Sequence, residues 1–346
     1  MSFAPERGES EMIYWPLAPV TLTHIILGVF RWSRTTYSII APYERMTVII
    51  PVYNEKKDIT ATLRAILNQS DPPDQIIISD NGSQDETCLV IDRLLMAKGY
   101  ALREIFKQRN SLVRIGQYEN NKAPSITIMQ HRHQTSKADS INEIQKYKLI
   151  KNSRTLTIDS DTILDPRFIE RMNENWYTLR IYRNRVVVNE AEILGATVLP
   201  KKNPRAGLQE RAIAMAREAE YTFGQILVRN GQNFTALYVT PGCGFMCRAD
   251  KLILPDRTVT EDLELTQTIQ SERKTNRLSK SNLDKFITEG FQLKIDNHLV
   301  PLVQFLQKLG KPVYFTENNA AYVDSAFMYT QDPMDFKSLF TQVGRW

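Results

Sequence analysis

The stretch Met46-Thr-Val-Ile-Ile-Pro51 is the segment from which the fold class can be inferred. A continuous run of apolar and β-branched residues that ends at a proline predicts a strand buried on both faces. Similar runs recur at Ile76-Ile-Ile-Ser79, at residues 125–129 and at Leu156-Thr-Ile158. Apolar residues at helical spacing lie between these runs, in residues 58–67, 88–97 and 137–147. Strands that alternate with helices predict an α/β fold whose mostly parallel, Rossmann-like central sheet is flanked by helices.

The rest of the chain divides around this alternating region. Residues 1–45 are expected to form a lead-in that is helical or lies at a membrane interface, and residues 46–346 one domain. Within that domain, residues 46–161 and residues 162–346 are expected to form two halves. The second half is expected to contain strands at 186–188, 236–239 and 313–315 and a long helix at 205–227. Residues 266–297 are polar and charged, which predicts an insertion that is helical or partly mobile.

Composition limits the classes of function. With 346 residues, 42% of them hydrophobic, the chain can bury a large core and is not disordered. The net charge of +5 is a mild excess that suits phosphate-bearing ligands or an anionic membrane face and does not require nucleic acid. The odd count of three cysteines argues against a disulfide framework and favours a reduced, cytosolic compartment.

Targeting signals are also considered. No signal peptide is visible near the N-terminus, so secretion is not expected. The apolar stretch from Trp15 to Trp32 is interrupted by polar residues and is too short to span a bilayer. It is expected to pack on the domain, or alternatively to lie on a membrane surface. The predicted location is therefore the cytoplasm, with the cytoplasmic face of a membrane as the alternative.

Carboxylates follow the fourth predicted strand in the motif Asp159-Ser-Asp161. Ligands of open α/β sheets bind beyond the carboxyl ends of the strands. Residues two apart on an extended segment point to the same side, where two carboxylates repel each other unless a cation lies between them. Mg²⁺ or Mn²⁺ suits such hard oxygen ligands and completes its shell with substrate phosphates. The alternative is a turn acid and a helix cap.

Three further motifs have both a structural and a chemical interpretation. Asp80-Asn-Gly-Ser83 is a tight turn with Gly82 at positive φ, and it is also a candidate base-binding turn. Thr260-Glu-Asp262 opens a helix, where the helix dipole favours acids, and Asp262 is a candidate general base. Gln342-Val-Gly-Arg-Trp346 is either an amphipathic end or an arginine clamp on a diphosphate with an indole under a sugar ring.

The order of these motifs resembles the processive family 2 glycosyltransferases, which are the cellulose, chitin, hyaluronan and poly-N-acetylglucosamine synthases. The resemblance covers residue 46 to the end and implies a nucleotide-sugar-binding half at residues 46–161 and an acceptor and catalytic half at residues 162–346. Its motifs are Ile50-Pro-Val-Tyr-Asn-Glu55, Asp80-Asn-Gly-Ser83, Ser136-Lys-Ala-Asp-Ser-Ile-Asn142, Asp159-Ser-Asp161, Pro241-Gly-Cys-Gly-Phe245, Thr260-Glu-Asp262 and Gln342-Val-Gly-Arg-Trp346.

The resemblance implies a GT-A fold and an inverting, metal-dependent transfer of a hexose or N-acetylhexosamine from a UDP-sugar to a saccharide or other hydroxyl acceptor. It implies nucleotide contacts at Pro51, Tyr53, Glu55, Asp80, Lys137 and Asp159. It assigns the Mg²⁺ or Mn²⁺ to Asp159 and Asp161, and base catalysis to Asp262 with Glu261 beside it. It assigns the acceptor and diphosphate contacts to Gly242, Cys243, Gly244, Phe245, Gln342, Arg345 and Trp346.

The sequence also departs from the family pattern. Asn81 replaces a second acid of the turn, and Ser136 replaces a glycine before the lysine motif. The family's synthases continue into membrane helices, so a membrane or a membrane-embedded subunit is an expected partner in polysaccharide synthesis. The alternatives are a catalytically inactive paralogue that binds nucleotide sugars and, from a similar sheet, a nucleotidyltransferase.

Overall fold

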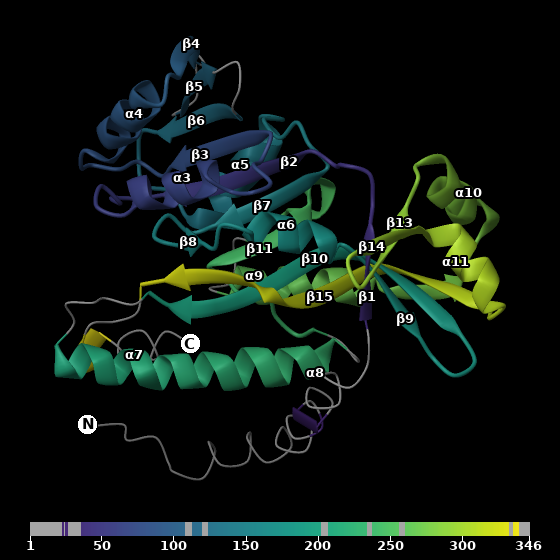
Figure 1. Cartoon of the computed structure of the whole chain (residues 1–346). Helices are drawn as coiled ribbons and strands as arrows, with labels where there is room; N and C mark the ends of the chain where they lie inside the picture. The colour runs from purple at the N-terminus through teal and green to yellow at the C-terminus, as the bar shows by residue number, and fades with distance from the viewer. Residues whose placement is uncertain are drawn as a thin grey trace, which may run out of the picture.

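A computed structural model describes residues 23, 25–26, 36–107, 113–119, 124–201, 207–233, 237–255, 260–331 and 335–338. The described strands form one large mixed sheet in the order β14-β13-β1-β9-β10-β11-β7-β2-β3-β6-β5-β4, with β15 beside β10. Helices cover both faces of the sheet's first half (Figure 1). No helix within the described ranges is both long enough and apolar enough to cross a membrane.

The parallel part of the sheet comes from the runs that the sequence singles out. The strands are β2 (Met46–Val52), β3 (Gln75–Asp80), β6 (Ser125–His131) and β7 (Arg154–Ile158), and β2 lies between β3 and β7. The connecting helices are α3 (Ile59–Leu67), α4 (Thr87–Ala97) and α5 (Lys137–Lys146). The antiparallel hairpin of β4 (Ala101–Lys107) and β5 (Val113–Glu119) extends the sheet beyond β6.

The two faces of β2 explain why helices pack on both sides. All seven residues of β2 are buried, and successive side chains of a strand point to opposite faces. Val48 and Ile50 belong to the core that contains α3 and α4, whereas Ile49 belongs to a second core that contains α5. A run that is apolar throughout is therefore required here, because neither face of the strand meets water.

The second half of the chain extends the sheet mostly with antiparallel pairs. β9 (Tyr177–Ile181), β10 (Val186–Pro200) and β11 (Gly244–Arg248) join β7 to the far end of the sheet. The long β15 (Val313–Thr330) runs parallel to β10 and pairs with β8 (Ile163–Leu164). Helix α6 (Phe168–Glu174) joins the first core, and α9 (Glu261–Ser271) joins the second. A short 3-10 turn, η2 (Ala249–Lys251), follows β11.

A folded lobe at one end of the sheet contains most of the predicted insertion. It comprises β12 (Lys274–Arg277), α10 (Lys280–Thr288), β13 (Gln292–Ile295), β14 (His298–Pro301) and α11 (Leu302–Leu309). Strand β1 (Thr36–Ile40) pairs with both β13 and β9, so the end of the predicted lead-in completes this lobe. Figure 1 shows α10, α11 and β13 gathered at this end of the molecule.

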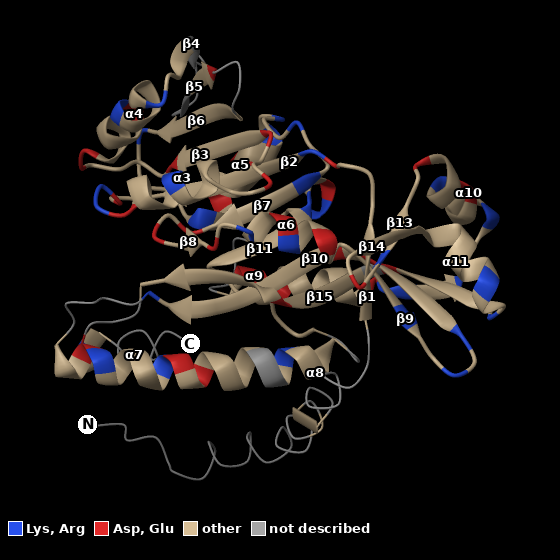
Figure 2. Cartoon of the chain, viewed as in Figure 1, with Lys and Arg blue, Asp and Glu red and all other residues tan. Residues whose placement is uncertain are grey.

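A long helical segment lies along the edge of the molecule next to β10 and β15 (Figure 1). It consists of α7 (Leu208–Tyr221), the π-helix η1 (Thr222–Arg229) and α8 (Asn230–Gln232). Basic and acidic residues are interspersed along α7 (Figure 2). The helix predicted at residues 205–227 is therefore present from residue 208, but its second part has π-helical hydrogen bonding.

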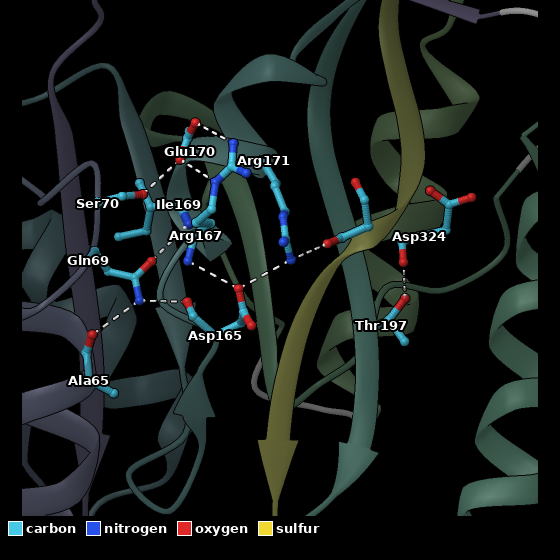
Figure 3. Close-up of polar contacts among 11 residues, drawn as sticks. Ala65, Gln69, Ser70, Asp165, Arg167, Ile169, Glu170, Arg171, Thr197 and Asp324 are labelled. Carbon is cyan, nitrogen blue, oxygen red and sulfur yellow. Dashed lines mark hydrogen bonds and ion pairs between the residues drawn. The ribbon is translucent and has the colours of Figure 1, made fainter.

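A polar network fixes the segment after β7 against both halves of the molecule (Figure 3). The Gln69 amide donates to the carbonyl oxygens of Ala65 and Asp165 and accepts from the Ile169 N–H, at 3.1, 2.8 and 3.0 Å. The Arg171 guanidinium donates to Asp165 Oδ1 at 3.2 Å and to the Ser325 carbonyl oxygen at 2.8 Å. This network connects three parts of the chain: α3, the loop that follows β8, and strand β15.

The predicted fold class is confirmed. Among the described strands, parallel pairing occurs within β2, β3, β6 and β7 and in the β10–β15 pair, and the other pairs are antiparallel. The strand predicted at residues 236–239 is wrong for the described residues 237–239, which have no regular structure. Residues 266–297 form helices and strands with a buried core rather than a loose insertion. The predicted helical lead-in falls mostly outside the described residues.

The lobe's core should depend on Phe286, which is 2% exposed and packs its ring 4.9 Å from that of Phe291 and 5.9 Å from that of Phe315. We expect Phe286→Ala to lower the free energy of unfolding by about 3–5 kcal/mol, because it removes buried apolar surface and leaves a cavity. Ile287→Ala is the matched control, since Ile287 is 56% exposed. Urea denaturation followed by circular dichroism measures both, and equal losses would contradict the described core.

Candidate functional site

The aspartate motif follows β7 and lies beside the loop before β11. Strand β11 pairs antiparallel with β7, with Gly244 opposite Ile158. The Asp159 N–H donates to the Cys243 carbonyl oxygen at 3.0 Å, and the Thr162 N–H donates to the Asp159 carbonyl oxygen at 3.1 Å. The sheet register therefore brings residues 159–161 next to residues 241–243.

Lys137 joins three segments that are far apart in the sequence. Its helix α5 starts at Ser136, whose hydroxyl accepts from the Asp139 N–H at 3.0 Å as an N-cap. The Lys137 ammonium donates to Asp159 Oδ1 at 2.6 Å and to the Gly242 carbonyl oxygen at 2.8 Å, and lies 3.9 Å from Glu261 Oε1. Burial lowers the pKa of Lys137, but the Asp159 carboxylate more than offsets this and holds the pKa above its usual value.

The acids at this edge of the sheet raise one another's pKa values. Burial and then the charge of Asp159 raise the pKa of Asp161. Glu55, in the loop after β2, has its pKa raised to about 7 by burial and then by Asp161, Asp58 and Asp159. The edge therefore concentrates more negative charge than Lys137 alone can neutralise.

Asp262 approaches the same region from the first turn of α9. It is 6% exposed, and burial raises its pKa, with the neighbouring Glu261 adding to the effect. A Cβ atom at Gly242 would lie 3.1 Å from Asp262 Oδ2. A side chain at this position would therefore press on the carboxylate, which would have to move by a few tenths of an ångström.

These residues line one cavity of about 760 Å³. Its predicted members come from the aspartate motif, from the lysine, from the loop before β11 and from the start of α9. They are Lys137, Asp159, Asp161, Gly242, Cys243, Glu261 and Asp262. The volume is within the range of small-molecule sites. Two carboxylates of the motif and the candidate base therefore face a shared space.

The turn at residues 80–83 is built as a structural element. Gly82 has a φ of +84°, and a Cβ atom there would lie 2.5 Å from the His133 carbonyl carbon. Asp80 is fully buried, and its oxygens accept from the Ser83 N–H at 3.0 Å and from the Cys88 thiol at 3.1 Å. Asn54, at a φ of 56°, accepts from the Gln84 N–H at 2.8 Å and joins the loop after β2 to this turn.

Other predicted site residues lie away from the cavity wall or outside the described residues. Pro51 is buried in β2, and Tyr53 follows that strand half-buried. Gly244 and Phe245 belong to β11, where Phe245 is part of the second core. A Cβ atom at Gly244 would lie 2.7 Å from Met328 Sδ, so this glycine serves close packing. Gln342, Arg345 and Trp346 lie outside the described residues.

Residues that the sequence did not point to form another part of the cavity wall. They are contributed mainly by the long helical segment and include Arg217, Glu220, Tyr221, Gln225 and Arg229. The helical pattern of residues 205–227 was visible in the sequence, but no motif indicated which of its polar side chains would meet the cavity.

The carboxylates fit a hard divalent cation, although they do not form a complete set of protein ligands. Asp159 and Asp161 offer oxygen ligands, and burial followed by the charge of Asp159 raises the pKa of Asp161. Within the described ranges, no three His, Cys, Asp or Glu side chains are grouped as metal ligands. A Mg²⁺ or Mn²⁺ ion held here would thus depend on substrate phosphates for its remaining ligands, as such ions commonly do.

Comparisons with known proteins point to glycosyl transfer. Residues 47–116 match the model of Glycosyl transferase family 2, and a search of curated proteins finds no match. The matched segment runs from β2 into β5 and includes the turn at residues 80–83. Together with the α/β architecture, this match confirms the predicted GT-A fold class and supports glycosyl transfer as the general reaction.

Solved structures with low similarity to this chain include the following two. The mannosyltransferase PcManGT from Pyrobaculum calidifontis, in complex with GDP-Man and Mn²⁺, has 17% identity and a TM-score of 0.43, over 74% of this chain and 62% of that chain. S. aureus TarS has 13% identity and a TM-score of 0.41, over 83% of this chain and 37% of that chain. This chain therefore spans less than two thirds of either protein.

Lys137 should stabilise the fold most where its acidic partners are ionised. We expect Lys137→Met, in the presence of EDTA, to lower the free energy of unfolding at pH 8 by up to about 3 kcal/mol, because Asp159 and Glu261 lose their cation. The loss should shrink at pH 4, where protonation relieves the repulsion. Thermal melts at both pH values measure this, with the exposed Lys146→Met on the same helix as control. An equal loss at both pH values would contradict the electrostatic role.

Proposed function

We propose that this chain is an inverting, metal-dependent glycosyltransferase that moves a hexose or N-acetylhexosamine from a UDP-sugar to a hydroxyl acceptor. The observation that supports it is that Asp159, Asp161, Lys137 and Asp262 line one shared cavity. The match of residues 47–116 to the family 2 model supports the reaction class.

The part of the cavity around Asp159, Asp161 and Lys137 suits a departing diphosphate. A divalent cation bound to Asp159 and Asp161 would supply positive charge against the charge that builds on the leaving group. The Lys137 ammonium, now paired with Asp159 at 2.6 Å, adds a second positive charge in the same part of the cavity. Acids alone there would repel a nucleoside diphosphate, so both cations serve donor binding.

The part of the cavity around Asp262 suits activation of the acceptor. The Asp262 carboxylate takes the proton of the attacking hydroxyl, whose oxygen bonds to the anomeric carbon as the bond from that carbon to the diphosphate oxygen breaks. Attack from the face opposite the leaving group inverts the anomeric centre in one step. The raised pKa of Asp262 makes it a stronger base than an ordinary aspartate.

Finer parts of the proposal rest on the sequence resemblance. These are assembly of a polysaccharide, closure of the site by Gln342, Arg345 and Trp346, work at the cytoplasmic face of a membrane, and a membrane or membrane-embedded partner. Uridine contacts by Pro51, Tyr53, Glu55 and Asp80 belong to the same group. Asp80 would contribute through the geometry of its turn, since both of its oxygens already accept hydrogen bonds.

A second candidate is a nucleotide-sugar-binding protein without turnover. The replacement of a second acid of the turn by Asn81, beside Asp80, favours this candidate. Release of nucleoside diphosphate from individual UDP-sugars with Mn²⁺ or Mg²⁺, with the product identified by mass, separates the two. Donor binding by calorimetry without any release or transfer would select the non-catalytic protein.

Removal of the base should abolish most of the activity. We expect Asp262→Asn to lower kcat about 10²–10⁴-fold and to leave the affinity for UDP unchanged, because only the proton transfer is lost. In the parent, kcat/KM should fall as pH drops through a pKa above 3.8, the usual aspartate value, since Asp262 must be ionised. Steady-state kinetics from pH 4 to 8 measure both, and an unchanged kcat in the variant would reject Asp262 as the base.

Gly242 should matter because of the space it leaves. A Cβ atom there would lie 3.1 Å from Asp262 Oδ2, so Gly242→Ala should shift the base and lower kcat about tenfold. Gly224→Ala is the control, because a Cβ atom at Gly224 meets nothing within 4 Å. Kinetics and UDP calorimetry of both variants test this, and equal effects of the two would contradict the close approach.

A further inference from the structure

The part of the cavity wall formed by the long helical segment contains a cation, Arg229, to which the proposed reaction assigns no role. Most polar side chains of this wall are already engaged. Arg217 pairs with Glu220 at 2.8 Å, lies over the Tyr221 ring at 4.5 Å and donates to the Tyr221 hydroxyl. Gln225 accepts from the Val198 N–H at 2.7 Å. These contacts fix the wall and leave Arg229 as the side chain to explain.

Arg229 is buried without a full set of partners. Its Nη1 atom is shielded from solvent and has no hydrogen-bond partner. The closest ring stacking is with Tyr322, whose centroid lies 6.0 Å from the guanidinium carbon, at the limit of a favourable cation–π contact. A buried donor left unpaired costs free energy, and more so when it is charged. A side chain in this state at a cavity wall indicates that a ligand completes its bonding.

Local helix geometry brings Arg229 to the cavity. It is the last residue of the π-helix Thr222–Arg229. Hydrogen bonds from i to i+5 rotate later residues relative to an α-helical continuation, and π-helical turns are frequent at functional sites. Gln225 and Arg229 both line the cavity as a result.

Arg229 is within reach of the charge of Asp262, the candidate base. Asp262 is the carboxylate among the groups that act most strongly on the guanidinium, whereas the Lys137 ammonium pairs with Asp159 at 2.6 Å and lies 3.9 Å from Glu261. The Lys137 ammonium therefore serves binding of the donor, and the Arg229 guanidinium lies near the candidate base. An anion bound there would be repelled by Asp262 unless a cation lay beside it.

We propose that Arg229 binds an anionic group of the acceptor, so that the acceptor is an acidic saccharide or a phosphate-bearing polyol. This rests on the proposed function and narrows its acceptor class. The planar guanidinium matches a carboxylate or a phosphate through paired hydrogen bonds, and Arg229 lines the same cavity as Asp262. The anion would thus hold the attacking hydroxyl beside Asp262.

Matched acceptors test the inference. With an active UDP-sugar donor, methyl glucuronide is compared with methyl glucoside, and glycerol 1-phosphate with glycerol. We expect one charged acceptor to exceed its neutral match at least about tenfold in kcat/KM, the equivalent of one good ionic contact. Arg229→Gln should remove that preference through the KM of the acceptor, leaving the KM of the donor unchanged, and Arg229→Lys should restore part of it.

Equal use of charged and neutral acceptors by the parent would overturn the proposal. So would a change in donor KM or UDP affinity in Arg229→Gln, which would assign the guanidinium to the diphosphate. A preference for methyl glucuronide over methyl glucoside would indicate a carboxylate, and a preference for glycerol 1-phosphate over glycerol would indicate a phosphate. Arg211→Gln, an exposed position on α7, is the control and should keep the preference.

Two measurements keep the inference independent of turnover. Calorimetry of methyl glucuronide and of glycerol 1-phosphate with the UDP-loaded parent should show binding of one of them, and Arg229→Gln should lose it, even if no transfer is found. Binding of neither would reject the inference. The ligand-free melting temperature of Arg229→Gln should equal or exceed that of the parent, because an unpaired buried charge is removed; a clear drop would assign Arg229 a structural role instead.

Discussion

The contact of the Lys137 ammonium with Asp159 Oδ1 and the Gly242 carbonyl oxygen is the interaction on which the site depends. The segment after β7 and the segment before β11 meet on this one cation, and Glu261 of α9 lies 3.9 Å away. Pairing in the sheet fixes the end of β7 and the start of β11. The lysine fixes the adjoining loop residues, and Gly242 there passes close to Asp262 without a side chain of its own. The aspartate motif and the start of α9 are therefore connected through Lys137 and Gly242.

Charge balance explains why the site needs ligands near Asp161 and near Arg229. Around Asp161, burial and neighbouring acids raise carboxyl pKa values, so this region is short of positive charge. Around Arg229, the buried Nη1 is short of an acceptor. The shortage of positive charge near Asp161 favours a bound cation with a diphosphate, and the unpaired Nη1 of Arg229 favours a bound anion. The polarity of the cavity is thus a property of its walls rather than of any one motif.

The first half of the fold could be predicted because its strands are buried on both faces, which makes runs such as Met46 to Ile50 apolar throughout. The lobe could not be predicted, since its core is assembled from separated residues such as Phe286, Phe291 and Leu293 within polar sequence, and β1 reaches it from the other end of the chain. In the site, motifs identified Asp159, Asp161 and Asp262. Phe245, predicted as an acceptor contact, packs in the core because alternation along β11 directs it there.

Arg229 illustrates why motif spacing misses half of this site. A helical pattern predicts which residues face the core at 3.6 residues per turn, and a π-helix changes that phase partway along the same pattern. Tyr221 is the last residue of α7, whereas Gln225 and Arg229 lie within the π-helix, and all three line the cavity. The selectivity of the proposed transferase for its acceptor would then be set by helix geometry, whereas its chemistry is set by loops at the strand ends.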